Sequence, residues 1–312
     1  MELTTEIKQK LALLEEKYAA MGQDMTSYLD GLIHADYLTY WDYIHLDTLL
    51  SLQTPRTPID DERIFIIYHQ ITELYFKLIL QAIDGIADKL DITATDMKYY
   101  LKRLNVYFDN LISSFRIMYE VLNHEEFMKF RMSLLPSSGF QSVQYRKIEI
   151  CSTPIINLVN YKARPQLQKS TDETEIYQHL YWKTGATELA TGKKTLTLKQ
   201  FEKNYSHDLI HLIRDFYHKN IWMRFGQLTK QEQQDIELLE LMRNYDFRAN
   251  VLWPLSHYKA AARHLQRDPV DIAATGGTNW QKYLPPKNQR ILFFPELWTD
   301  EEFENWGKKI TL

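Results

Sequence analysis

The 312-residue sequence is poor in cysteine and glycine. Its single cysteine, Cys151, excludes a disulfide framework within the chain, and it excludes Cys-based zinc sites and iron–sulfur clusters, because these need several thiolates. The 10 glycines form neither a GxGxxG nor a GxxxxGK[ST] motif, so the phosphate-binding loops of dinucleotide and nucleotide enzymes are missing. A lone thiol fits a reducing compartment, and we therefore expect a cytoplasmic protein.

An excess of positive charge and long hydrophobic runs are also lacking. The 37 basic residues are interleaved with 41 acidic ones, so no continuous basic stripe exists to bind phosphates, and we expect no nucleic-acid partner. No run approaches the roughly 20 apolar residues that a membrane span requires. The charged, amphipathic N-terminus has no apolar signal-peptide core, so we expect neither export nor membrane anchoring.

Much of the sequence shows apolar residues at helical spacing. Hydrophobic residues make up 45% of it, enough for a substantial core. Apolar residues recur every three to four positions over residues 5–20, 61–90, 96–122, 124–134, 140–151, 198–222, 230–250 and 254–265. This spacing predicts an all-α fold. There are no repeats or long linkers, which favours a single domain over residues 1–312 with loop insertions at 184–197 and 268–290.

The most informative segment is PSSGFQSVQYR, residues 136–146. Pro136 and Gly139 interrupt the backbone where it can approach a ligand, and Ser138 offers a hydroxyl donor. Arg131, five residues before the proline, carries a planar fork that suits a carboxylate. The segment has the makeup of a pocket wall, and the alternative is an ordinary interhelical turn with capping serines.

Two histidines with i, i+4 spacing, His207 and His211, invite a comparison with zinc-protease helices. At about 100° per residue they share a stripe with Arg214, whereas Leu209 and Ile213 face the other way. A permanent cation on that stripe opposes a metal dication. We interpret the pair as part of a solvated helix face.

His69 lies on the almost wholly apolar stretch FIIYHQITELYFKLIL. Helical spacing predicts that Phe65, His69 and Thr72 share one face, so an aromatic ring and an imidazole project side by side. His257 follows Trp253 by one turn, and small alanines come after it, which leaves room for a flat bulky group. A lone histidine in such a place can be an axial haem ligand, and for both histidines a hydrogen-bonded core role is the alternative.

Several motifs, in the same order along the chain, resemble those of the tryptophan 2,3-dioxygenase family. They are TYWDYIHLDTLLSLQ (39–53), DERIFIIYHQITELYFKL (61–78), FMKFR (127–131), PSSGFQSVQYR (136–146), WPLSH (253–257), ATGGT (274–278) and LFFPELW (292–298). The resemblance implies an all-α helical-bundle enzyme with haem b. It also implies that L-tryptophan and O2 react to give N-formyl-L-kynurenine, the first step of tryptophan catabolism by the kynurenine route.

The resemblance also implies roles for individual residues. His257 would be the axial ligand of the haem iron, with Trp253 beside the haem and Ser138 reaching a propionate. His69 would be the catalytic histidine that hydrogen-bonds the indole N–H. The implied substrate-binding residues are Phe65, Phe127, Arg131, Thr275, Tyr40, Tyr43 and Ile44.

Tyr40, Tyr43 and Ile44 belong to an N-terminal segment, residues 1–53, that the family exchanges between subunits. The resemblance therefore implies a homotetramer, a dimer of dimers. Three positions depart from the family's pattern, since Phe127 stands where some relatives carry tyrosine, Pro254 enters the stretch before His257, and Ala274 replaces the first glycine of a GTGG-like run. The gap from His257 to Thr275 is also a few residues longer than the pattern leads us to expect. A related haem enzyme acting on another aromatic, such as a tyrosine hydroxylase or a modified-indole oxygenase, is one alternative. A non-catalytic haem-binding helical protein is the other.

Overall fold

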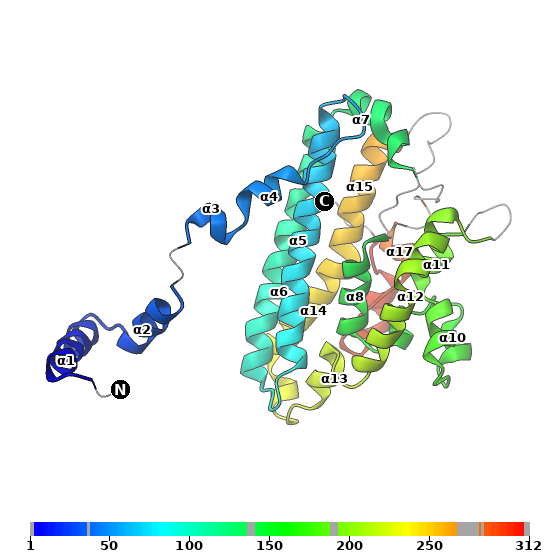
Figure 1. Ribbon diagram of the computed structural model, residues 1–312. Coiled ribbons are helices and arrows are strands. Elements are labelled where there is room, and N and C mark those ends of the chain that lie inside the picture. The colour runs from blue at the N-terminus through cyan, green and yellow to red at the C-terminus, as the bar shows by residue number, and fades with distance from the viewer. Residues whose placement is uncertain are drawn as a thin grey trace. The chain divides into compact units, whose positions relative to one another are not determined.

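The computed structural model describes residues 3–35, 38–135, 141–187, 193–266, 281 and 284–308. Its chain divides into two compact units, residues 1–54 and 55–312 (Figure 1). Within the described residues the fold is all-α, as the sequence predicts, and the only β pairing is two isolated bridges. The described helices include none that is long and apolar enough to cross a membrane.

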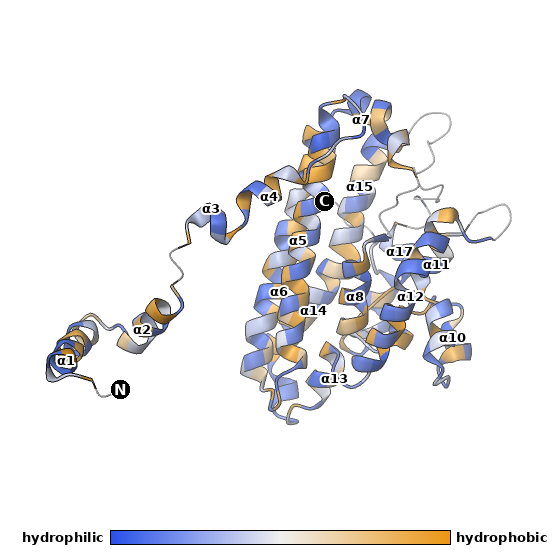
Figure 2. Ribbon diagram, in the orientation of Figure 1, coloured by the Kyte–Doolittle hydropathy of each residue, from blue (hydrophilic) through white to orange (hydrophobic). Residues whose placement is uncertain are grey.

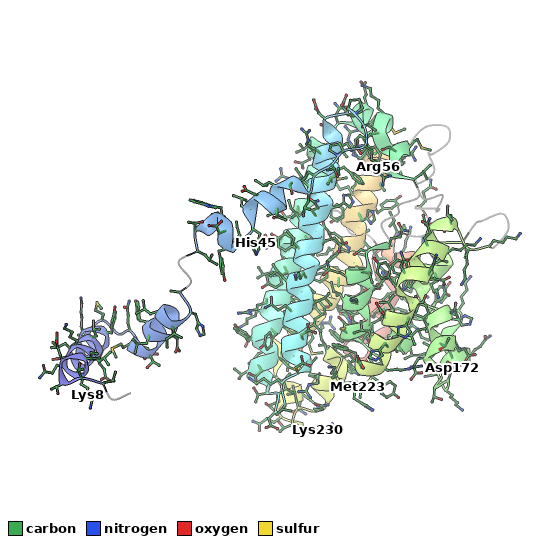
Figure 3. The ribbon with its side chains drawn as sticks, in the orientation of Figure 1. Lys8, His45, Arg56, Asp172, Met223 and Lys230 are labelled. Atoms are coloured by element: carbon green, nitrogen blue, oxygen red, sulfur yellow. The ribbon has the colours of Figure 1, made fainter. Side chains whose placement is uncertain are left out.

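The N-terminal unit contains four helices without a core of their own. They are α1 (Thr5–Ala20), α2 (Met25–Ile33), α3 (Tyr40–Tyr43) and α4 (Leu46–Ser51), and none of their described residues is buried. Side-chain caps start the first two, because Thr4 and Asp24 accept hydrogen bonds from backbone N–H groups of the first turn. His45, labelled in Figure 3, has φ of 52° and redirects the chain between α3 and α4.

Long helices form the centre of the second unit. They are α5 (Asp61–Ala87), α6 (Ala94–Ser114), α14 (Ile236–Phe247) and α15 (Trp253–Leu265), and in Figure 1 they run side by side. Hydrophobic and hydrophilic residues alternate along them, as amphipathic helices require (Figure 2). Their apolar faces bury a continuous core that includes Ile79, Ile83, Leu104, Phe108 and Tyr245.

A second layer of helices packs against this bundle. Here α8 (Val143–Ser152) contacts α5 and α12 (Leu196–Asp215), and α13 (Ile221–Gly226) contacts α5 and α8. The remaining helices are short: α7 (His124–Phe130), η2 (Arg131–Leu134), η4 (Ile155–Leu158), α9 (Arg164–Leu167), α10 (Glu173–Gln178), α11 (Tyr181–Gly185), η5 (Glu232–Gln234), α17 (Pro286–Gln289), η7 (Pro295–Leu297) and α18 (Asp300–Glu304).

Two predicted helices are wrong in extent. The stretch 198–222 is not continuous, because the chain leaves the helix at Phe216. The Asn220 side-chain amide donates to the Phe216 carbonyl, and its oxygen accepts from the Met223 N–H. Asn220 therefore ends one helix and caps the start of the next, α13. The stretch 96–122 is α-helical only to Ser114 and then widens into a π-helical turn, η1 (Ile117–Val121).

A second π-helical turn, η6 (Arg248–Leu252), joins α14 to α15. Trp253 donates its backbone N–H to the carbonyl of Arg248, five residues back, where an α-helix would use Ala249. Pro254 follows and has no N–H to donate. The turn therefore lies directly before the helix that carries His257.

The C-terminal segment is fastened to the bundle by one buried carboxylate. Asp246 on α14 accepts hydrogen bonds from the backbone N–H groups of Phe293 and Phe294, from the Trp298 indole and from the Asn250 amide. Burial raises the pKa of Asp246, and these four donors oppose that effect. This contact fixes the motif LFFPELW against the helices.

Candidate functional site

His69 projects from the middle of α5 beside Phe65, as the helical spacing predicts, with ring centroids 4.1 Å apart. Its Nδ1 lies 2.7 Å from the Phe65 carbonyl oxygen. A carbonyl can only accept, so Nδ1 carries the proton, and Nε2 of the neutral ring is left as an acceptor.

Although solvent reaches the His69 ring, protein surrounds it densely, and desolvation lowers its pKa. The hydrogen bond to Phe65 and the charge of Glu73 act in the opposite direction but are the smaller effects. The neutral ring is therefore favoured at neutral pH.

His257 lies on α15, and desolvation lowers its pKa to about 4. The charge that His69 would carry when protonated is the second, smaller cause of this lowered pKa. The two imidazoles therefore interact electrostatically, although they are far apart in the sequence. Among the described residues no hydrogen bond is made by either ring nitrogen of His257, so a neutral imidazole with an available lone pair is present there.

A continuous row of aromatic rings connects the two histidines. Tyr68 lies edge-on to His69 with centroids 5.4 Å apart, and 5.6 Å separate the centroids of Tyr68 and Phe115. Phe115 in turn is stacked on His257 at 5.9 Å. Trp253, which is buried, packs on Phe115 with ring centroids 4.6 Å apart and the ring planes tilted by 46°, so the wall of this site is aromatic.

The end of α7 completes the His69 side of the site. Phe127 lies 6.4 Å from Phe65 between ring centroids, and Phe130 lies 5.9 Å from the same ring. Arg131 follows at once as the first residue of η2, is buried, and has its pKa lowered by desolvation. It remains charged, because the pKa of a guanidinium is far above neutral pH. Two predicted residues, Phe65 and Phe127, therefore meet next to His69, and Arg131 directly follows the Phe130 that packs on Phe65.

The remaining predicted substrate- and propionate-binding residues are Ser138, Thr275, Tyr40, Tyr43 and Ile44. Ser138 and Thr275 lie outside the described residues. Tyr40, Tyr43 and Ile44 belong to the N-terminal unit, where the two tyrosines are highly exposed and Ile44 is partly exposed.

His207 and His211 lie on a solvent-exposed face of α12, as the helical stripe predicts. The side chains of His207 and His211 are 93% and 65% exposed, whereas Leu209 and Ile213 are buried. The described residues contain no group of three or more His, Cys, Asp or Glu side chains that could hold a metal ion.

Tyr68, Phe115 and Phe130 were missed from the sequence. Each is an aromatic residue on a periodic apolar face, and nothing in that pattern distinguishes a site wall from ordinary core. The sequence signal that could have identified two of them is their position directly before a predicted site residue, since Tyr68 precedes His69 and Phe130 precedes Arg131.

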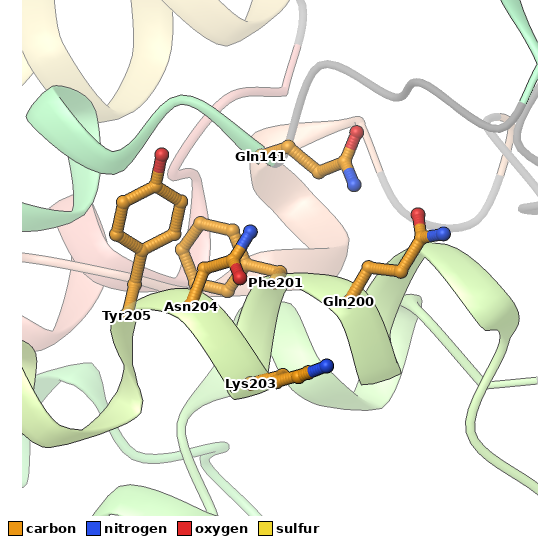
Figure 4. Close-up of a pocket in the computed structure, with 6 residues that line it drawn as sticks. All are labelled: Gln141, Gln200, Phe201, Lys203, Asn204 and Tyr205. Atoms are coloured by element: carbon orange, nitrogen blue, oxygen red, sulfur yellow. The ribbon is translucent and has the colours of Figure 1, made fainter.

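A separate pocket of about 450 Å³ lies over α12. Figure 4 shows its lining residues, Gln141, Gln200, Phe201, Lys203, Asn204 and Tyr205. None of the predicted site residues lines it. Its polar lining does not match the aromatic wall between His69 and His257.

Residues 32–269 match the family model described as Tryptophan 2,3-dioxygenase. A protein of that name from Bacillus anthracis is 27% identical over 285 residues, covering 85% of this chain and 94% of that protein. The relatives of that name from Ruegeria sp. (strain TM1040) and Sorangium cellulosum (strain So ce56) are 40% and 37% identical over 116 and 124 residues. These two alignments span 41% and 30% of the relatives' own lengths.

Proposed function

Because the chain belongs to the tryptophan 2,3-dioxygenase family, we propose that it cleaves the indole C2–C3 bond of L-tryptophan with O2, giving N-formyl-L-kynurenine. The observation that supports the proposal is the row of aromatic rings that joins His69 to His257. The single cysteine, which is buried and free, supports a cytoplasmic location.

We assign haem b to His257. A neutral imidazole with an available nitrogen is the form that ligates iron, and the aromatic side chains of Phe115 and Trp253 beside His257 suit the apolar faces of a macrocycle. When bound, haem supplies the activation of O2. Ser138 remains our proposed partner of a haem propionate.

His69 orients the substrate and has no need to be a strong base. With Nδ1 donating to Phe65, its Nε2 can accept a hydrogen bond from the indole N–H. The same ring packs against Phe65, so the indole can lie on an aromatic surface while its nitrogen is held. Both contacts restrict rotation of the substrate and bring it close to a reactive geometry.

Arg131 binds the carboxylate of the substrate. It is buried next to Phe130, in a place where water competes weakly for the guanidinium, so a bidentate ion pair there is strong. Phe127 has no hydroxyl to add to that contact. We assign the ammonium group of tryptophan to Thr275.

The N-terminal unit would complete the site from a neighbouring subunit of a homotetramer. Its apolar residues, including Tyr40 and Tyr43, are exposed, as expected of a segment that packs on another chain. An active protein should therefore be an oligomer.

The deciding experiment uses the haem-loaded, anaerobically reduced protein. L-Tryptophan and then air are added, and N-formylkynurenine is measured by its absorbance and by mass. Wild-type protein should form it, and His257→Ala should not, because it retains no haem. Haem binding without this product would refute the proposed reaction, and an absence of haem binding would refute the cofactor as well.

A further inference from the structure

The π-helical turn η6 leaves one backbone carbonyl without a partner in the helix. Trp253 donates to Arg248, so it does not serve the Ala249 carbonyl as it would in an α-helix. The next residue, Pro254, has no N–H at all. Ala249 is fully buried, so water cannot satisfy its carbonyl.

The Tyr145 hydroxyl fills this gap. It donates to the Ala249 carbonyl oxygen across 2.9 Å, from the facing helix α8. Its ring is held by Phe76 of α5, with centroids 5.4 Å apart, and lies 6.4 Å from Trp253. Tyr145 thus connects the turn to two other helices.

The turn determines which way His257 points. A π-helical turn contains one more residue than an α-helical turn, and one residue corresponds to about 100° of rotation about a helix axis. If η6 reverted to α-helix, α15 would rotate against α14 and carry His257 away from His69 and Phe115. Resting on the proposed function, we propose that Tyr145 is a positioning residue for His257: its hydroxyl holds the π-helical turn and thereby the direction of the iron ligand.

Tyr145→Phe tests this inference, because it removes only the hydroxyl. The matched control is Tyr245→Phe. Tyr245 is a fully buried tyrosine whose hydroxyl lies 2.7 Å from Ser152 Oγ, and it likewise joins α14 to α8. Each variant loses one buried hydrogen bond, so each should lower Tm by about 2–4 °C.

Only Tyr145→Phe should disturb the site. We expect its apparent Kd for hemin to rise about tenfold over wild type, with an altered Soret band, because a buried carbonyl loses its donor and His257 is no longer held. Tyr245→Phe should keep the wild-type affinity and spectrum. In the haem-free protein, the Trp253 amide should exchange its hydrogen faster in Tyr145→Phe than in Tyr245→Phe.

Pro254→Ala provides a second test, because it restores an N–H near the Ala249 carbonyl. The effect of Tyr145→Phe on hemin affinity should be smaller in the Pro254→Ala background than in wild type. The effects of Tyr245→Phe and Pro254→Ala on hemin affinity should simply add. The inference is overturned if the two tyrosine variants match in hemin affinity, spectrum and amide exchange, or if Tyr145→Phe and Pro254→Ala are additive. Should wild type bind no hemin, the proposed function fails, and amide exchange still decides the positioning role.

Discussion

Burial of the neutral His257 ring should make the haem-free protein sensitive to acid. Its pKa is about 4 in the folded chain against 6.5 for an unperturbed histidine, so the unfolded state takes up a proton more readily. The free energy of unfolding contributed by this difference is complete above pH 6.5 and is lost as pH falls from 6.5 to 4.

The two pKa values give the size of the effect. Between pH 7.5 and pH 5, proton uptake by the unfolded state lowers the free energy of unfolding by about 2 kcal/mol through this one residue. His69 acts in the same direction, since desolvation lowers its pKa too, and the access of solvent to its ring weakens the effect.

The assay is urea unfolding of the haem-free protein at both pH values, for wild type and for His257→Gln, whose side chain stays neutral. The loss on acidification should be smaller in the variant by about 2 kcal/mol. His207→Gln is the control, because that side chain is 93% exposed. Equal losses in wild type and His257→Gln would refute the burial of a neutral imidazole at this position.

Three further predictions concern substrate binding, orientation and the C-terminal segment. Arg131→Ala should raise KM for L-tryptophan, since losing a buried charge pair costs about 2–5 kcal/mol; steady-state kinetics with Arg131→Lys as comparison checks this. His69→Ala should lower kcat/KM for L-tryptophan but keep hemin affinity, and the loss should shrink with 1-methyl-L-tryptophan, which has no indole N–H to donate. Asp246→Asn should lower the free energy of unfolding by about 2–4 kcal/mol in urea titrations, because an amide would face backbone donors that now meet a carboxylate.

Local periodicity predicted the parts of the fold that depend on neighbouring residues along one helix. The contact of Phe65 with His69 follows from i, i+4 spacing on α5, and the exposure of His207 and His211 follows from the opposite stripe on α12. These predictions were confirmed, because each depends on backbone geometry that helices keep wherever they pack.

The sequence could not predict where helical geometry changes. The π-helical turn at η6 differs from α-helix by one residue, and its cost is offset by a tertiary hydrogen bond from Tyr145. The break at Phe216 similarly depends on what the Asn220 side chain bonds. The closeness of His69 and His257 is also tertiary, because it follows from how α5 and α15 pack.

At each end of the helix that carries His257, a side-chain hydrogen bond satisfies a carbonyl that a π-helical turn leaves unpaired. In η1, Leu122 donates to Ile117 instead of Met118, and the Asn123 N–H donates to Asp61. The Met118 carbonyl is thereby left to a side chain, and Nε2 of the buried His264, near the end of α15, lies 2.7 Å from it.

Just before α15 begins, the Tyr145 hydroxyl likewise donates to the carbonyl of Ala249. A π-helical turn alone releases a carbonyl and would be unstable in a dry core. Two such turns, each closed by a side chain from another helix, fix both the rotation and the axial position of α15. An iron ligand needs both, since a neutral imidazole must meet the metal along its lone pair, and a one-residue slip at η6 would turn His257 out of the space that it shares with His69.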